Sequence, residues 1–560
     1  MKEIIRQKIE EAIRELLARV AAQSVADRSE DGLPVFDVSR VKDERFGDYS
    51  TNVAMILAKL LGKSPMEIAE LISQQITNNN QQGIPFEKIE VARPGYINFF
   101  LSPRYFEGVL GEVIGKGEQF GDLEIGKGLK IDNEVISANP TGPLHLGNAR
   151  GGFCGDALSR IMRKAGYDVT NEYYVNDAGE QVEKLGHSVL KDEEAVYAGD
   201  YVDALHQRLT VNNEQKTVRE VGERSAEHVL EEMIKPTVTE RMGIPVDLWI
   251  SEKRDIVDAG LVDKAIETLK GKGLTFESEG ALWLKTTAFG DDKDRVLVKS
   301  DGSRTYFASD CGYILHKKER GFSRLILILG ADHHGYRTRL QAAASALGFE
   351  GTYDISFVQL VRLMKDGKEV RMSKRAGNVV TIDELLEKIP VDVARFFFLM
   401  YSPDTHMNFD LGLAEERSAK NPVYYVQYAH ARLASILRKA EEAGLDSRFH
   451  GNDKEKDGNL DFSLLAHPKE RAILRELAFF PELVEEAATE RAPHRLPQYA
   501  MRLADKLHSF YDECKVIDPE NRELSKARLA LISATKIVLK ETLGLMGVSA
   551  PERMESNEDK

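Results

Sequence analysis

The feature that most constrains the fold of this chain is an alternation of strand-like and helix-like segments that begins near residue 129. The run Arg324 to Leu329 is apolar without interruption, as expected for a strand that is buried on both faces. Strands that alternate with helices favour a parallel sheet covered by helices. The strand-like segments are 131–137, 169–175, 324–329 and 355–361, and the helical ones are 148–165 and 337–347. The sequence therefore predicts an α/β domain over about 120–390.

The regions that flank this domain have different patterns. The first residues are helical in periodicity, as are residues 52–61, and a strand-like stretch follows at 96–101, which together predict a small α+β domain. After about 390 the strand patterns fade and helical patterns continue to Gly547, which predicts an all-α domain. We thus predict a multidomain α/β protein with domains at 1–110, 120–390 and 391–560.

Length, net charge and residue composition limit the kinds of protein that this chain can be. A length of 560 residues allows three or four domains. The net charge of −15 excludes a chain coated in basic residues, but it leaves room for a local basic groove. The three cysteines are too far apart for a zinc ribbon or a disulfide framework, so a reducing, cytoplasmic setting is expected. No run of eighteen apolar residues occurs, so no membrane-spanning segment is expected. The polar stretch 448–459 is expected to be an exposed loop.

The loop between the first predicted strand and helix, residues 137–148, has the features of a nucleotide-binding turn. Ligands of open α/β sheets bind at the carboxyl ends of strands, and a helix N-terminus offers free N–H groups to phosphate. Gly147 lets the backbone approach a nucleotide closely. His145 can donate a hydrogen bond to a phosphate whose charge grows during reaction. The competing interpretation is a plain strand–turn–helix with an incidental histidine.

A second loop, Arg371 to Asn378, is basic and follows a strand-like segment. Cations in such a loop can stabilise a pentavalent α-phosphate, and Lys365 and Lys368 lie just upstream. Taken alone, the loop would be a solvated turn. The chain has no Gly-x-x-x-x-Gly-Lys-[Ser/Thr] motif, so a P-loop is excluded.

In this order, the two loops resemble the two signatures of class I aminoacyl-tRNA synthetases. His145 and Gly147 match His-x-Gly-His, with Asn148 in place of the second histidine. Lys374 matches the second lysine of Lys-Met-Ser-Lys-Ser, with Arg371 in place of the first. The resemblance implies that His145 and Lys374 are catalytic, that ATP binds with Mg²⁺ and that no tightly bound cofactor is present. It also implies an ATP site made of Pro140, Gly142, His145, Gly147, Asn148, Met372, Ser373 and Lys374.

Within this superfamily the chain resembles the arginyl-tRNA synthetases, over nearly its whole length. The stretches that carry the resemblance are Gly47–Ala54, Tyr173–Gly179, Met372–Val380, Asn421–Arg432 and Ala550–Met554. The resemblance implies a Rossmann-like catalytic domain, an N-terminal domain that meets the tRNA elbow through residues 46–52 and 96–98, and a helical domain that binds the anticodon region.

The same resemblance implies a pocket for arginine. A guanidinium presents five donors in a planar fork, which carboxylates match best. Asp310 would pair with the guanidinium, and Tyr306, one helical turn away on the same face, would lie beside it. Glu134, Ser137 and Asn139 complete the implied pocket. The competing interpretations are a strand-end salt bridge for Glu134 and a surface helix turn for Tyr306 and Asp310.

Two features of the pocket stay open at this stage. A further polar ligand is expected after the strand that ends at Gly330, and Asp332, His333 and His334 are the candidates. The adjacent histidines do not by themselves make a metal site, so no metal is predicted.

RNA contacts are expected on the helical domain. Tyr424, Tyr428 and Arg432 interleave aromatic and basic side chains, which can stack on bases and contact phosphates. The alternative is that some of these residues form the core of a helical bundle, because Tyr424 and Tyr428 are four residues apart and so lie on one face of a helix.

Three functions remain open from the sequence. The resemblance implies ATP-dependent ligation of L-arginine to tRNA through an arginyl-adenylate, with release of pyrophosphate and AMP, by a monomer that needs tRNA even for the first step. The alternatives are a paralogue that holds tRNA without chemistry, motivated by Asn148 and Arg371, and a nucleotidyltransferase with a small substrate.

Overall fold

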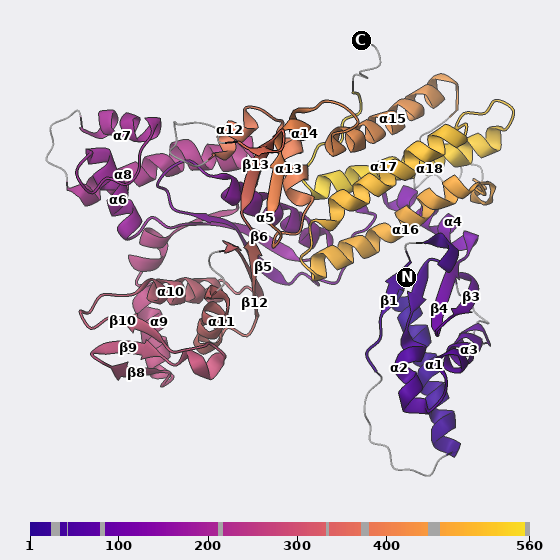
Figure 1. Cartoon of the computed structure of the whole chain (residues 1–560), viewed down its shortest axis with the longest axis horizontal. Coiled ribbons are helices and arrows are strands. Elements are labelled where there is room, and N and C mark those ends of the chain that lie inside the picture. Colours follow the sequence, from indigo (N-terminus) through magenta and orange to yellow (C-terminus); the bar gives the residue numbers. More distant parts are fainter. Residues whose placement is uncertain are drawn as a thin grey trace. The chain divides into compact units, whose positions relative to one another are not determined.

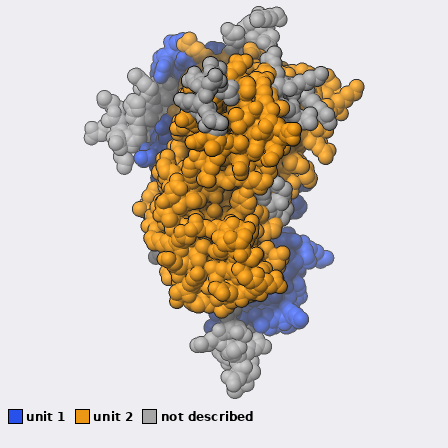
Figure 2. Space-filling model, turned by 90° about the vertical axis from the view of Figure 1, so that its left-hand side faces the viewer, with its two compact units in different colours: residues 1–120, 432–482, 505–538 blue, residues 121–431, 483–504, 539–560 orange. Residues whose placement is uncertain are grey.

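The structure, a computed structural model, describes residues 1–23, 34–41, 43–78, 85–210, 217–331, 335–370, 380–445 and 460–554. The chain groups into two compact units, coloured separately in Figure 2. Unit 1 comprises residues 1–120, 432–482 and 505–538, and unit 2 comprises residues 121–431, 483–504 and 539–560. The predicted domain boundaries stay predictions, and the predicted loop at 448–459 lies outside the described residues.

The N-terminal part of unit 1 is an antiparallel sheet with helices against it. Its strands, in the order β1-β2-β4-β3, are β1 (Val38–Arg40), β2 (Tyr49–Thr51), β3 (Phe86–Ala92) and β4 (Tyr96–Leu101). Its helices are α1 (Lys2–Gln23), α2 (Val53–Leu61), α3 (Pro65–Asn78) and α4 (Pro103–Lys116). Ile5, Ile9 and Ile13 of α1 are fully buried, which confirms the amphipathic first helix.

The centre of unit 2 is a five-stranded parallel sheet, as predicted. Its order is β12-β11-β5-β6-β7, with β5 (Lys130–Ala138), β6 (Asp168–Val175), β7 (Leu248–Ser251), β11 (Arg324–Gly330) and β12 (Thr352–Val358). α5 (Leu146–Lys164) joins β5 to β6, and α11 (Tyr336–Leu347) joins β11 to β12 (Figure 1). β5 pairs with β6 on one side and with β11 on the other, so the chain connections diverge at the carboxyl end of β5.

Both faces of this sheet are covered, which explains the uninterrupted apolar run in β11. Ile326 packs with Leu158 and Met162 of α5. Its neighbours Leu325 and Leu327 belong to the core on the other face, with residues of α9 (Leu261–Gly271), α10 (Tyr306–Glu319) and α11. Successive side chains of a strand point to opposite faces, so each face receives apolar residues from the same strand.

Two insertions interrupt the sheet, and the sequence patterns did not predict them. Between β6 and β7 lie α6 (Glu180–Leu190), α7 (Asp200–Thr210), α8 (Val218–Val229) and π-helical turns at Leu230–Ile234 and Thr237–Arg241. After β7 come a π-helical turn at Glu252–Val257, α9, and an antiparallel sheet of β8 (Thr275–Ser278), β9 (Ala281–Leu284) and β10 (Arg295–Val298).

The predicted strand 355–361 is in fact two strands. β12 ends at Val358, and β13 (Val361–Lys365) pairs with β14 (Lys368–Glu369) and with β15 (Met407–Asp410), a strand in the region predicted to be helical. The break occurs at Gln359, whose carbonyl accepts a hydrogen bond from Arg150 at 2.9 Å.

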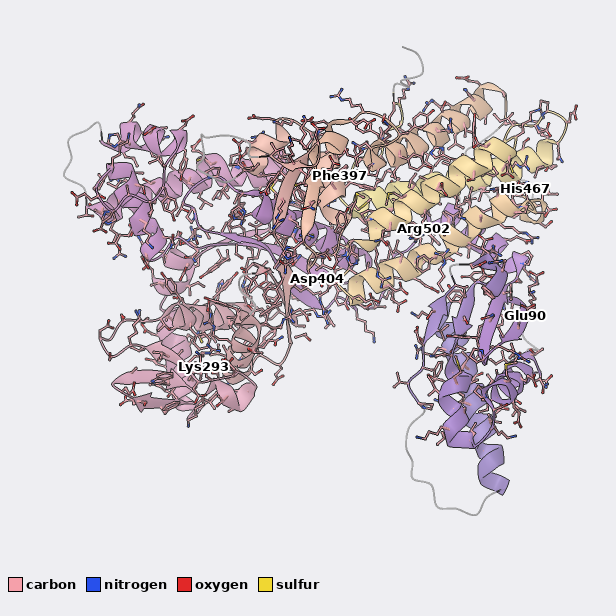
Figure 3. The ribbon with its side chains drawn as sticks, in the orientation of Figure 1. Glu90, Lys293, Phe397, Asp404, His467 and Arg502 are labelled. Carbon is pink, nitrogen blue, oxygen red and sulfur yellow. The ribbon has the colours of Figure 1, made fainter. Side chains whose placement is uncertain are left out.

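The remaining helices follow. They are α12 (Ile382–Leu386), α13 (Val391–Leu399), α14 (Leu411–Glu415), α15 (Pro422–Glu442), α16 (Pro468–Thr489), α17 (Arg495–Glu513) and α18 (Arg522–Leu545). Phe397 of α13, labelled in Figure 3, packs against Phe409 of β15 with ring centroids 5.4 Å apart, and Phe398 lies 5.7 Å from Phe153 of α5. No helix in the described part of the chain is long and apolar enough to cross a membrane.

Helices α6 and α8 cross at two glycines, which generates a prediction about stability. A Cβ at Gly186 would overlap the carbonyl oxygen of Val218, and a Cβ at Gly222 would overlap that of Val182. We expect Gly186→Ala to lower the free energy of unfolding by about 1–3 kcal/mol, because the helices must move apart. Gly271→Ala on α9, where a Cβ meets nothing within 4 Å, should be neutral or slightly stabilising. Urea unfolding followed by circular dichroism tests this, and equal effects of the two substitutions would refute the close crossing.

Candidate active site

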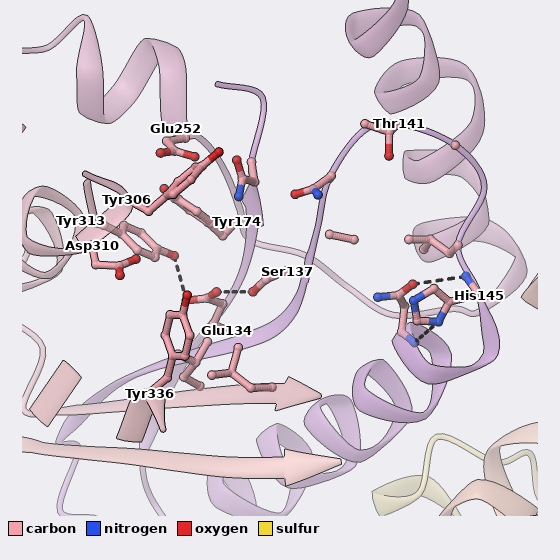
Figure 4. Close-up of a pocket in the computed structure, with 18 of the residues that line it drawn as sticks. Glu134, Ser137, Thr141, His145, Tyr174, Glu252, Tyr306, Asp310, Tyr313 and Tyr336 are labelled. Atoms are coloured by element: carbon pink, nitrogen blue, oxygen red, sulfur yellow. Dashed lines mark hydrogen bonds between the residues drawn. The ribbon is translucent and has the colours of Figure 1, made fainter. Parts of the chain in front are cut away.

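A cavity of about 650 Å³ opens where the chain connections of the parallel sheet diverge. Its walls include residues at the carboxyl ends of β5, β6 and β11, the place where open α/β sheets bind ligands. Eight of the predicted site residues line it together: Glu134, Ser137, Asn139, Gly142, His145, Asn148, Tyr306 and Asp310. Figure 4 shows His145 and Thr141 at one end of the cavity and a group of acidic and tyrosine side chains at the other.

His145 is the N-cap of α5, and this role fixes its tautomer. Its Nδ1 accepts hydrogen bonds from the backbone N–H groups of Gly147 and Asn148, at 3.0 and 3.3 Å. An accepting Nδ1 carries no proton, so the ring proton of the neutral imidazole is on Nε2. Asn148 returns the interaction, because its Oδ1 accepts from the backbone N–H of His145 at 3.2 Å. The off-pattern Asn148 therefore completes a capping box.

The residues that follow the second signature are hydrogen-bonded to the first signature. Val380, which follows the basic loop, accepts a hydrogen bond through its carbonyl from the N–H of Leu146 at 3.3 Å. Thr381 forms an isolated antiparallel bridge with His145. The loop itself, with the predicted residues Met372, Ser373 and Lys374, lies outside the described residues.

The turn between β5 and α5 is held by a tyrosine from the first insertion. Tyr201 donates a hydrogen bond from its hydroxyl to the carbonyl of Thr141 at 2.9 Å. Its ring lies against Gly142, where a Cβ would be 2.9 Å from the tyrosine oxygen, so a side chain at this position would displace the Tyr201 hydroxyl. Pro140 is buried, and neither Pro140 nor Gly147 is among the residues that line the cavity.

Two carboxyl groups at the other end of the cavity form no salt bridge with any residue that the structure describes. Asp310 of α10 has a buried Oδ2 that accepts no hydrogen bond from the described residues. Burial raises the pKa of Asp310 to about 7, although Arg339 opposes the shift. Burial also raises the pKa of Glu252 to about 7, against hydrogen bonds from Ser309 and Tyr174. A cationic ligand placed here would favour the ionised form of both groups.

Glu134, in contrast, is already paired. Its Oε2 accepts from Lys317 Nζ at 2.7 Å and from Tyr313 Oη at 3.0 Å, and Ser137 donates to its Oε1. Lys317 is fully buried and also lies 2.7 Å from Asp132 and 3.2 Å from Glu172. Glu134 therefore forms a buried salt bridge, within β5 rather than at its end, and it also lines the cavity.

Several lining residues were not assigned a role from the sequence. They are Tyr174, Asn176, Tyr197, Tyr201, Glu252, Tyr313, Tyr336 and Thr381. Tyr174 and Asn176 lie within the recognised stretch 173–179, but nothing in that pattern distinguishes a lining side chain from a core one. Glu252 and Tyr201 come from the insertions. The three candidates for a further ligand, Asp332, His333 and His334, lie outside the described residues.

The residues expected to contact RNA have mixed environments. Tyr424 and Tyr428 are half-buried, whereas their neighbour His430 is buried and contacts the Pro551 carbonyl at 2.9 Å. The guanidinium of Arg432 lies 4.5 Å from the ring centre of Tyr511. Tyr424, Tyr428 and Arg432 are all half-buried, so their contacts with RNA stay predictions. In the N-terminal domain Phe46 and Tyr96 are exposed.

Comparisons with known proteins match three successive regions of the chain. Family models match as "Arginyl tRNA synthetase N terminal domain" at residues 3–101, "tRNA synthetases class I (R), catalytic domain" at residues 122–394 and "DALR anticodon binding domain" at residues 426–554. The arginine–tRNA ligase of Bacillus subtilis strain 168 is 44% identical over 577 residues, covering 99% of this chain and 99% of that protein.

Two solved structures agree. The arginyl-tRNA synthetase of Thermus thermophilus has a TM-score of 0.76 at 25% identity and covers 99% of this chain and 100% of its own. A putative arginyl-tRNA synthetase from Campylobacter jejuni has a TM-score of 0.70 at 32% identity, over 81% of this chain and 100% of its own. With 44% identity to a relative over 99% of its length, this chain belongs to the arginyl-tRNA synthetase family.

Proposed function

We propose that this protein ligates L-arginine to its cognate tRNA at the expense of ATP, the reaction named for its Bacillus relative. The observation that carries the proposal is the division of one cavity into two chemically distinct ends. One end has the buried carboxyl groups of Asp310 and Glu252, which suit a guanidinium. The other has the Nε2–H of His145 beside the segment that ends the basic loop.

The arginine side chain would enter the acidic end. Asp310 and Glu252 would accept from the guanidinium, with Tyr306 at the rim of the cavity. Ser137 and Asn139, which line the same cavity, would hold the α-amino and carboxylate groups. Glu134 would act beside them with its charge already balanced by Lys317.

Activation would then proceed at the His145 end. The α-carboxylate of arginine attacks the α-phosphate of ATP in line, pyrophosphate leaves and arginyl-adenylate forms. The Nε2–H of His145 donates to the phosphate oxygens as their charge rises, and the ammonium of Lys374 supplies a second stabilising charge. Pro140, Gly142, Gly147, Asn148, Met372 and Ser373 are the other proposed ATP-site residues, and Mg²⁺ enters as part of the nucleotide substrate.

Transfer would complete the reaction. The 2′-hydroxyl of the terminal adenosine of tRNA attacks the adenylate carbonyl, the arginyl ester forms and AMP leaves. We propose that the helical domain binds the anticodon region through Tyr424, Tyr428 and Arg432. Residues 46–52 and 96–98 of the N-terminal domain would meet the tRNA elbow.

A charging assay with a matched lysine pair tests the function. We expect purified protein with ATP, Mg²⁺ and arginine-accepting tRNA to charge labelled arginine. Lys374→Ala should lower kcat by roughly 10²- to 10³-fold, because one transition-state cation is lost. Lys388→Ala, at an exposed position after α12, should leave kcat unchanged. Binding of tRNA without charging would instead indicate a paralogue that has lost the chemistry.

The acidic end is tested by Asp310→Asn. The substitution keeps the size of the side chain but removes the charge that a guanidinium would pair with, so we expect the KM for arginine to rise roughly 10- to 100-fold. Asp301→Asn, in an exposed turn before α10, is the control and should not change this KM. Steady-state kinetics measures both, and an unchanged KM for Asp310→Asn would remove Asp310 from the pocket.

A further inference from the structure

A buried ion pair anchors helix α5 at its middle, several turns away from the N-cap residue His145. Asp156, in the middle of α5, accepts a hydrogen bond at its Oδ2 from Arg395 Nη1 at 2.6 Å and from Arg160 Nε at 3.0 Å. Asp156 and Arg395 are both buried. Because a helix is stiff over this length, the place at which α5 is fixed also sets the position of its N-terminal residue.

Arg395 of α13 uses all five of its donors. Besides the bond to Asp156, Nη1 donates to the Met546 carbonyl at 3.3 Å, and Nε and Nη2 donate to the Met242 carbonyl at 3.1 and 2.8 Å. Nη2 also donates to the Gly243 carbonyl at 2.8 Å. Lysine cannot reproduce this planar set of bonds. One guanidinium therefore joins α5 and α13 to residues 242–243 and to the segment after α18.

The segment after α18, residues 546–551, is called the C-terminal strut below. On one side it meets α13: a Cβ at Gly547 would overlap Arg395, and the N–H of Ser549 donates to Asp392 at 3.2 Å. On the other side it meets α15: Gln427 donates to the Ser549 carbonyl at 3.0 Å, and His430 contacts the Pro551 carbonyl at 2.9 Å.

The strut thus connects the helix that carries Tyr424 and Tyr428 to the helix that His145 caps (α15 and α5 in Figure 1). Gln427 and His430 are buried, and the two tyrosines are half-buried on the same helix. Two more contacts tie α5 to the end of α18: Lys164 to Glu541 at 3.0 Å, and Arg160 to the Gly544 carbonyl at 3.4 Å.

We propose that Arg395 and the C-terminal strut position His145 for the reaction with ATP, and that they couple this position to α15. The inference rests on the proposed role of His145. Arg395 touches no substrate, so it is a positioning residue. A change in α15 moves the strut, the strut moves the Arg395–Asp156 pair, and α5 carries the displacement to the imidazole.

The test compares the KM for ATP with the KM for arginine instead of measuring activity alone. Arg395→Lys keeps the charge but loses the fork, so kcat should fall about 10- to 100-fold and the KM for ATP should rise. The KM for arginine should stay within about twofold, because Asp310 and Glu252 lie on other elements. Arg163→Gln, on the same helix α5 but bonded to Val169 and Asp247 rather than to the strut, is the control and should match the wild type.

A double-mutant cycle tests the coupling to α15. Gln427→Ala should show the same ATP-specific defect as Arg395→Lys, and the double variant should be no worse than the more severe single one. Ser549→Ala, which leaves the buried ion pair intact, carries the test if Arg395→Lys does not fold. Additive effects, or equal losses in the KM values for arginine and ATP, would overturn the proposal. His145→Gln with full kcat would overturn the role of His145 instead, whatever the strut variants do.

Discussion

A single buried ammonium organises the substrate end of the sheet. Lys317 lies 2.7 Å from carboxylate oxygens of both Asp132 and Glu134 and 3.2 Å from Glu172. Removing one partner of such a buried group costs about 3–5 kcal/mol, because the remaining charges are left unpaired. β5 and β6 supply the acids and α10 supplies the lysine, so this cluster fixes α10 against the sheet. The same helix carries Asp310, whose position in the cavity depends on that contact.

The cluster also divides the acids of the cavity into two kinds. The charge of Glu134 is balanced by Lys317, and the carboxylate accepts hydrogen bonds from Ser137 and Tyr313. Glu134 therefore shapes the cavity more than it attracts a cation. Asp310 and Glu252 form no salt bridge with the residues that the structure describes, and burial raises the pKa of both to about 7. A bound guanidinium would stabilise the ionised form of both carboxyl groups. A neutral side chain of similar length would leave them buried without an opposite charge. In the proposed function, Asp310 and Glu252 would therefore favour a side chain that carries a guanidinium.

Periodicity and short motifs predicted the elements that are local in sequence. The parallel strands, the helix after His145 and the first helix have patterns that the buried faces of the structure explain. His145 was found because it lies in a loop between a predicted strand and a predicted helix, whereas Glu134 and Asp310 were named through the resemblance to the family. Lys317 could not be found this way, because it meets Glu134 across 183 residues and has no pattern of its own. Glu252 and Tyr201 come from insertions, and the carbonyl at the break between β12 and β13 accepts a hydrogen bond from Arg150, which is distant in the sequence.

If Asp310 and Glu252 bind the guanidinium of arginine, binding must change the protonation of both carboxyl groups. With pKa values near 7, both groups hold part of a proton in the empty cavity at pH 7, and a bound cation lowers these pKa values. Calorimetric titration of arginine at pH 7, in buffers of different ionisation enthalpy, measures the protons exchanged. The account predicts release of roughly half a proton to one proton per arginine, and less with Asp310→Asn. Proton uptake, or no exchange in the wild-type protein, would contradict it.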